Sequence, residues 1–372
     1  MRNAAKTICA SLLVTAALAC GACASVEQAP SPAANASPAA GKPVLVSEGV
    51  ETPCKVSFAA GDEAHRELFL QEGDSVAVIA PSSLPTPEQV DATVAGLKSW
   101  GYVPVLGKHV VESERTLKDC LDDLRWALED PGTRAIFCVR GGYGASEVMD
   151  ELPLELVASS RKLIIGYSDI TVFHSAWTSA GVPSLQSCMS ATFDGLSDSS
   201  AAAIHRVIAG DIPTYTCEAS ELCRGGEAEG VLIGGNLSTF VSVLGTAYDC
   251  TQTDEPYILF FEDVEENYQH VHRYLTLLKH LGVLDKAAGI VFGEWTDYTT
   301  EGSGYMGDSR GGTFSSMADM ISRELLGDAS IPVAYGFPAG HGDQNYPLLM
   351  GVPAQLRVCE GTFTLDWPTQ KQ

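Results

Sequence analysis

The residues best suited to chemistry are a serine, a glutamate and a histidine that occur in this order along the chain. Ser168 follows a short apolar run that ends in Gly166, and the pattern after it is helical. A serine at such a strand-to-helix turn has its hydroxyl lifted out of the sheet, and the amides after it point to where an oxyanion would form. We therefore expect Ser168 to be a nucleophile. Ile170 stands where a second glycine is usual, and plain turns with this pattern also occur.

Glu262 and His341 supply the two other groups that a serine nucleophile needs. Glu262 ends the apolar segment 257–261, and His341 lies between two glycines, a position with little packing purpose. An imidazole suits the general base, and a carboxylate suits the group that orients and charge-stabilises it. We expect a Ser–Glu–His triad. Further acidic residues follow Glu262, so a solvated acidic turn is the alternative interpretation of this position.

The segment Arg140-Gly-Gly-Tyr-Gly144 directly follows another apolar run. Glycines at a strand end let backbone amides approach a ligand closely or complete an oxyanion hole. The Arg140 guanidinium has the two-pronged shape that binds a substrate carboxylate. The plainer alternatives are a tight turn before a helix and an ion pair with one of the many acidic residues.

Strands and helices alternate around these residues. Apolar runs predict strands at 75–80, 103–106, 135–139 and 163–165, and helical patterns occur at 87–100 and after Thr116. This alternation predicts an α/β fold with a parallel sheet that binds ligands at the carboxyl ends of its strands. A second block has strand patterns at 257–261 and 289–293 and a helical pattern at 271–281, before a Gly/Ser-rich loop from Tyr298 to Ser315.

Composition and pattern changes divide the chain into five segments. We predict a leader at 1–24, a tether and unassigned segment at 25–72, an N-terminal domain at 73–210, a linker at 211–229 and a C-terminal domain at 230–372. The 372 residues, 45% of them hydrophobic, suffice for two domains with substantial cores. The net charge of −24 argues against a nucleic-acid partner, because phosphates would be repelled.

The N-terminus has the features of a targeting segment. Arg2 and Lys6 precede an apolar stretch from Ile8 to Ala19 that is too short to span a bilayer comfortably. Small residues follow, and Cys20 and Cys23 resemble a bacterial lipoprotein attachment site, although neither has the usual leucine three residues before it. We expect export to the cell envelope or beyond. The only membrane contact that the sequence suggests is through a lipid anchor, and whether the anchor is present is left open. Whether the protein forms a homodimer is also left open.

The cysteines outside the leader show no metal-ligand spacing. Cys120 and Cys138 lie in apolar patterns and are expected to be packing residues. Cys217 and Cys223 are close enough in sequence to form a disulfide in an oxidising compartment, although connectivity cannot be read from spacing.

Six short motifs together resemble the LD-carboxypeptidase family of serine peptidases, which also includes self-immunity proteins that cleave microcin C. They cover the chain from about Gly73 to its C-terminal end. In chain order the motifs are Ile79-Ala-Pro-Ser82, Arg140-Gly-Gly-Tyr-Gly144, Ile165-Gly-Tyr-Ser-Asp-Ile-Thr171, Ile233-Gly-Gly-Asn-Leu237, Phe261-Glu-Asp-Val264 and Pro338-Ala-Gly-His-Gly342.

The resemblance implies an N-terminal α/β domain with the nucleophile, a C-terminal mixed α/β domain with the other two triad members, and an active site between them. Ser168 is then the nucleophile, Glu262 the carboxylate and His341 the base, and the amides of Gly142 and Asp169 are the expected oxyanion donors. The substrate implied is a peptidoglycan tetrapeptide that loses its terminal D-alanine, with no metal or organic cofactor. The export leader and the long Gly/Ser-rich stretch depart from the family pattern.

Three alternatives differ from this assignment. The same chemistry can act on a peptide–nucleotide antibiotic or another amide. A non-catalytic wall-binding lipoprotein can use the same scaffold. The third alternative, a nucleotide-binding α/β protein, is supported by the glycine loop alone, and this loop lacks the GxGxxG spacing.

Overall fold

The structure, a computed structural model, describes residues 45–48, 54–61, 68–193, 195–299, 314–327 and 330–368. The leader at 1–24, with Cys20 and Cys23, and most of the Gly/Ser-rich stretch after Tyr298 lie outside these ranges. No helix among the described residues is long and apolar enough to cross a membrane.

One sheet has six strands in the order β13-β7-β6-β5-β3-β4. All neighbouring pairs are parallel except β13 with β7. The strands are β3 (Ser75–Ile79), β4 (Val103–Leu106), β5 (Ala135–Cys138), β6 (Leu163–Gly166), β7 (Ser184–Gln186) and β13 (Leu348–Met350). The expected parallel α/β layer is therefore present.

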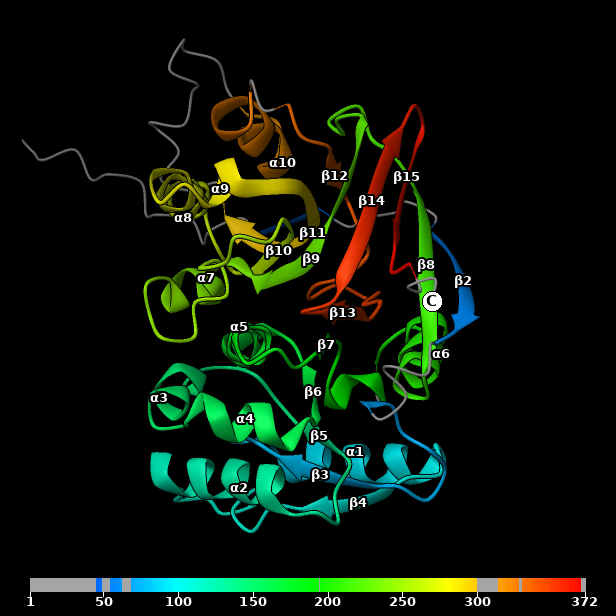
Figure 1. Cartoon of the computed structure of the whole chain (residues 1–372), viewed down its shortest axis with the longest axis vertical. Coiled ribbons are helices and arrows are strands. Elements are labelled where there is room, and N and C mark those ends of the chain that lie inside the picture. The colour runs from blue at the N-terminus through cyan, green and yellow to red at the C-terminus, as the bar shows by residue number, and fades with distance from the viewer. Residues whose placement is uncertain are drawn as a thin grey trace, which may run out of the picture. The chain divides into compact units, whose positions relative to one another are not determined.

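Helices accompany this sheet (Figure 1). They are α1 (Pro87–Ser99), α2 (Leu117–Glu129), α3 (Ala145–Asp150), α4 (Leu154–Ser160), α5 (Thr171–Ser179) and α6 (Asp198–Ile208), with short 3₁₀ turns at Ser168–Ile170 and Ser190–Thr192. Thr86 and Thr116 begin α1 and α2 with capping boxes, which satisfy amides that a helix start leaves unpaired. The apolar face of α2 is buried through Leu121, Leu124 and Leu128.

The strand order explains where a site can form. The chain goes from β3 outward to β4 on one side, and then to β5, β6 and β7 on the other. Ligands of such sheets bind at the carboxyl ends of the strands where this reversal occurs, here β3 and β5. The segment after β3, the glycine loop after β5 and Ser168 after β6 all lie at this edge.

The second sheet has nine strands, eight in the order β1-β11-β10-β9-β14-β15-β8-β2, with β12 paired to β11. They are β1 (Leu45–Glu48), β2 (Cys54–Ala60), β8 (Asp211–Glu218), β9 (Gly226–Asn236), β10 (Tyr257–Val264), β11 (Ala287–Thr299), β12 (Val333–Tyr335), β14 (Pro353–Cys359) and β15 (Thr362–Asp366). The strands β9, β10, β11 and β12 are parallel, whereas the other pairs are antiparallel, so this sheet is mixed.

The helices of this second part gather beside β9, β10 and β11 (Figure 1). They are α7 (Leu237–Phe240), α8 (Tyr268–His280), α9 (Val283–Lys286) and α10 (Met317–Met320), with a 3₁₀ turn at Val241–Val243 and a π turn at Ile321–Leu325.

Several expectations need correction. Residues 211–229, predicted to be a linker, contain β8 and the start of β9, because every second side chain of β8, at Pro213, Tyr215 and Cys217, is buried against the core. Part of the segment 25–72 forms β2, which pairs with β8 at the sheet edge. The strand predicted at 289–293 extends from Ala287 to Thr299.

The disulfide also differs from the expected one. Cys217 is bonded to Cys54, its partner across the β2–β8 pair, and Cys223 is a free thiol. The disulfide partner is determined by which strands pair, and the paired strands are far apart in sequence. The spacing of cysteines along the chain does not reveal such pairing. Cys120 and Cys138 are buried, as their apolar surroundings predicted.

Candidate active site

Ser168 occupies a sharp turn between β6 and α5. Its φ is +63°, a left-handed conformation that is uncommon for a residue with a side chain and is typical of functional turns. Ile170, the residue in place of the second glycine, is fully buried. A Cβ on Gly166 would lie 3.0 Å from the Ile170 side chain, so Ile170 fills the space beneath the turn.

The glycine loop after β5 contacts this turn directly. A Cβ on Gly141 would lie 2.9 Å from the Ser168 Cβ and 3.1 Å from its Oγ, so only glycine permits this approach. Gly142, the expected oxyanion donor, has a φ of +115°, and its Cβ position is filled by the Ser83 hydroxyl. The loop therefore lies beside the serine, with Gly141 as the glycine in direct contact.

The Asp169 carboxylate connects three loops at this edge of the sheet. Its Oδ2 accepts hydrogen bonds from the Ser82 hydroxyl and from the Ala145 amide, the latter at 2.9 Å. Arg115 donates to the backbone carbonyls of Ala80 and Ser82. Burial raises the pKa of Asp169, while the Ser82 hydroxyl and the Ala145 amide oppose that change. Asp169 thus fixes the segment after β3 and the start of α3 against the serine turn.

Glu262 and His341 are paired. Glu262 is fully buried in β10, and its Oε2 lies 2.7 Å from the Nδ1 of His341, whose side chain is 16% exposed. Burial alone would lower the pKa of His341, but Glu262, Asp263 and Glu294 outweigh it and raise that pKa. With Nδ1 held by Glu262, Nε2 is the nitrogen available to exchange a proton with a hydroxyl.

Two contacts bring the His341 side of the site to the Ser168 side. The ring of Tyr167, the residue before the serine, packs on the His341 imidazole with 4.7 Å between ring centroids. The backbone amide of Asn236, at the end of β9, donates a hydrogen bond of 2.9 Å to the hydroxyl of Thr171, the first residue of α5. The ends of β6 and β9, from different sheets, therefore meet at the serine turn.

Asn236 also connects to the carboxylate that follows Glu262. Its side-chain amide donates to Asp263 Oδ1 at 2.8 Å, and the Ser238 amide donates to Oδ2 at 2.8 Å. Burial and the charge of Glu262 raise the pKa of Asp263 to about 7. Asp263 is thus a buried structural acceptor and not part of a solvated acidic turn.

Arg140 lies on the exposed rim of this edge. Its Nη1 donates to the Leu84 carbonyl at 3.1 Å. This bond fixes the guanidinium beside the segment after β3, and its role in binding a carboxylate stays a prediction.

Glu294, which no sequence motif indicated, accepts a hydrogen bond from the Gly342 amide at 2.8 Å. Glu294 is 4% exposed and follows the apolar run 289–293. A single carboxylate at the end of an apolar run can identify such a residue in the sequence, because a buried charge needs a partner. The Asp169 side chain was missed because its partners come from other loops.

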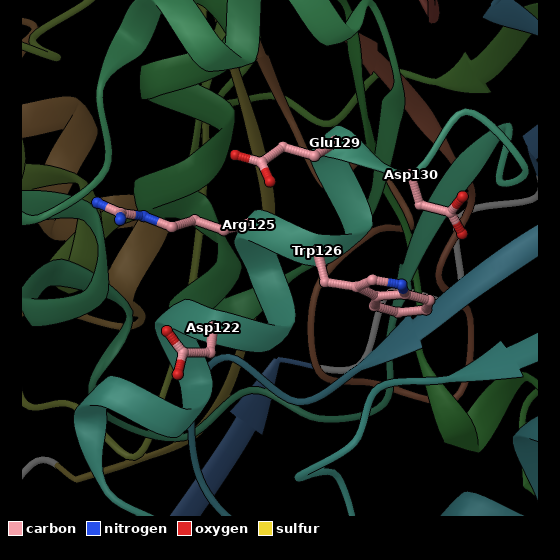
Figure 2. Close-up of a pocket in the computed structure, with 5 residues that line it drawn as sticks. All are labelled: Asp122, Arg125, Trp126, Glu129 and Asp130. Atoms are coloured by element: carbon pink, nitrogen blue, oxygen red, sulfur yellow. The ribbon is translucent and has the colours of Figure 1, made fainter.

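Other polar groupings lie on α2 and in the turn before it. One ring nitrogen of His109 and one carboxylate oxygen each of Asp119 and Asp122 lie within 4.8 Å of one another. However, His109 already bonds Glu112, and Asp122 pairs with Lys118. A surface hollow along the same helix is lined by residues of α2 and its C-cap (Figure 2). These residues are Asp122, Arg125, Trp126, Glu129 and Asp130.

Comparison with known proteins is consistent across sequence and structure. A model of the LD-carboxypeptidase N-terminal domain matches residues 76–187, and one of the LD-carboxypeptidase C-terminal domain matches 229–356. A putative carboxypeptidase of Streptomyces coelicolor is 31% identical over 82% of this chain and 97% of its own length. The murein tetrapeptide carboxypeptidase of Pseudomonas aeruginosa is 30% identical over 76% of this chain and 92% of its own.

A solved structure shows the same fold. The muramoyltetrapeptide carboxypeptidase from Oxalobacter formigenes superposes with a TM-score of 0.69 at 27% identity, covering 79% of this chain and all of that one.

Proposed function

Because the chain belongs to the LD-carboxypeptidase family and is a serine-type carboxypeptidase, we propose that it releases the terminal D-alanine of peptidoglycan tetrapeptides. The bond hydrolysed joins the L-centre of a diamino acid to that D-alanine. The observation that carries this proposal is the pairing of the buried Glu262 with His341, whose ring packs on Tyr167 next to the strained Ser168.

Each residue has a defined role in the proposed reaction. The Ser168 hydroxyl attacks the peptide carbonyl carbon while Nε2 of His341 takes its proton. Glu262 holds the Nδ1 proton and stabilises the imidazolium. Amides of the glycine loop and of Asp169 bind the oxyanion. His341 then gives the proton to the leaving amine of D-alanine, and water hydrolyses the acyl-enzyme by the same steps.

Arg140 is the proposed group for the terminal carboxylate of the peptide. An arginine binds a carboxylate with two parallel hydrogen bonds, and Arg140 lies on the exposed rim after β5, the strand that pairs with β6, which precedes Ser168. Such a contact explains a preference for a free C-terminus, since a longer peptide lacks a carboxylate at that position.

The deciding experiment measures D-alanine release from tetrapeptides that contain either meso-diaminopimelate or lysine. Ser168→Ala should lower kcat by about 10⁴-fold or more. Ser159→Ala, an exposed serine on α4, is the matched control and should keep full activity. Undiminished release by Ser168→Ala would refute the assignment.

The same assay separates the alternative substrates. A peptidyl-adenylate analogue offered in parallel should be turned over less efficiently than the tetrapeptide. The reverse ranking would assign the same chemistry to peptide–nucleotide compounds. A serine-reactive probe should label the protein and fail to label Ser168→Ala; muropeptide binding without labelling would indicate a non-catalytic wall-binding protein.

We also propose that the chain is exported. The support is the charged and apolar N-terminal pattern together with the Cys54–Cys217 disulfide, since such bonds persist in oxidising compartments. Mass spectrometry of the mature N-terminus tests this. A lipidated Cys20 or Cys23 establishes an anchor, a cleaved unmodified terminus establishes export alone, and an intact Met1 contradicts both.

A further inference from the structure

Glu294 is a second buried carboxylate beside His341 and has no part in the proposed triad. It lies on β11, next to β10, which carries Glu262. The pairing register of these strands shifts after Phe261. Phe261 pairs with Phe292, but Asp263 pairs with Trp295, so β11 has one more residue than β10 over this step. The extra residue on β11 is a bulge, a feature that re-aims side chains next to active sites. It occurs at Gly293 and Glu294.

The loop that carries His341 is hydrogen-bonded to Glu294 from two sides. The Glu294 amide donates to the Ala339 carbonyl at 3.0 Å, and the Gly342 amide donates to Glu294 Oε2 at 2.8 Å. His341 lies between these two attachment points.

The glycines flanking His341 are required by this arrangement. A Cβ on Gly342 would lie 2.1 Å from Glu294 Oε2. A Cβ on Gly340 would lie 3.2 Å from both Glu262 Oε2 and the Glu294 Cβ. The Gly-His-Gly segment therefore fits closely around two carboxylates, one bonded to the imidazole and one bonded to the following amide.

The charges around Glu294 come from both neighbouring elements. Burial raises its pKa to about 7, the Gly342 amide opposes this, Glu262 on β10 and Asp343 in the loop raise it further, and His341 lowers it. Glu294 in turn adds to the negative charge that raises the pKa of His341.

We propose that Glu294 is a positioning residue for the carboxypeptidase reaction: it fixes the His341 loop through the Gly342 amide and, when ionised, places a second negative charge beside the imidazole. This inference rests on the proposed function, because it takes His341 as the base. Its two parts can be separated, since glutamine keeps an acceptor for the amide but removes the charge, and alanine removes both.

The test compares the pH dependence of kcat/KM for the wild type, Glu294→Gln and Glu294→Ala between pH 5 and 9. Glu294→Gln should keep the plateau rate within about threefold and move the acid limb to lower pH. A displacement of about half a pH unit corresponds to roughly threefold more activity on that limb. Glu294→Ala should lower plateau kcat about tenfold with little change in KM, because the Gly342 amide loses its acceptor.

Asp343→Asn is the matched control, since it removes an exposed loop carboxylate that the Gly342 amide does not contact. Its acid limb should move less than that of Glu294→Gln. An NMR titration of labelled histidine, assigned with His341→Gln, gives the His341 pKa directly and should show it lower in Glu294→Gln.

An acid limb and a His341 titration that are unchanged in Glu294→Gln would overturn the proposal, even where Glu294→Ala fails to fold. If wild-type protein releases no D-alanine, the proposed function fails. The NMR titration then still decides whether Glu294 acts on His341.

Discussion

Ser168 is held in a conformation that its own residue type disfavours. A side chain in the left-handed region costs about 1–2 kcal/mol, and it persists only where the surroundings leave no alternative. Here Ile170 is buried beneath the turn and the Gly141 backbone lies against the serine side chain. Packing of Ile170 and contact with the Gly141 backbone therefore hold Ser168 in this strained conformation.

Glu262 should be decisive for catalysis through His341. Glu262→Gln keeps the size of the side chain but removes the charge that holds the Nδ1 proton, so kcat should fall by about 10⁴-fold. His341 acts as a base only when neutral, and its pKa is raised, so wild-type activity should fall as pH drops through a value above 6.5. The residual activity of Glu262→Gln should persist to a lower pH than the wild-type activity does.

The measurement is kcat/KM for D-alanine release across pH 5 to 9. Glu265→Gln, an exposed acid just beyond the same strand, is the control and should behave as wild type. A loss of less than tenfold in Glu262→Gln, or an acid limb at the wild-type position, would remove Glu262 from the triad.

At the scale of elements, the end of β9 should set how the two sheets meet. A Cβ on Gly235 would lie 2.5 Å from the Thr171 hydroxyl at the start of α5. Gly235→Ala should therefore push β9 away from the serine turn, with an activity loss of about 10²-fold, as expected for a displacement near 1 Å. D-alanine release and thermal unfolding, measured together, test this.

Gly245→Ala provides the comparison for that variant. Gly235 and Gly245 both have a positive φ, at +135° and +76°, so alanine is strained at either position. A Cβ on Gly245 meets nothing within 4 Å. Equal activity losses in the two variants would show that backbone strain, and not the contact with Thr171, is responsible.

The elements that could be predicted from sequence are those whose signals are local. Ser168, Glu262 and His341 each stand at the end of an apolar run or between glycines, and α2 shows its cap and apolar face directly. The strand β8, next to the edge strand β2, was missed because it has a proline, a cysteine and threonines in place of a continuous apolar run. Glu294 was missed because its partner, the Gly342 amide, lies 48 residues away in sequence.

At the scale of the whole molecule, the Cys54–Cys217 disulfide closes the far edge of the nine-stranded sheet. It joins β2 to β8, the last pair in the strand order, whereas Glu262 lies on β10 toward the other end. The bridged residues are 163 apart in sequence, so the bond removes considerable freedom from the unfolded chain. Stability and activity should therefore respond differently to its loss.

Replacing both cysteines with alanine should lower the free energy of unfolding by about 3 kcal/mol and leave D-alanine release at 25 °C within about twofold of wild type. Urea denaturation with and without dithiothreitol measures the effect. The reductant should destabilise the wild type by a similar amount and leave the double variant unchanged. Cys359→Ala, which removes an exposed free thiol, should retain the wild-type response. A wild-type midpoint insensitive to dithiothreitol would contradict a stabilising bridge and would weaken the case for an exported enzyme.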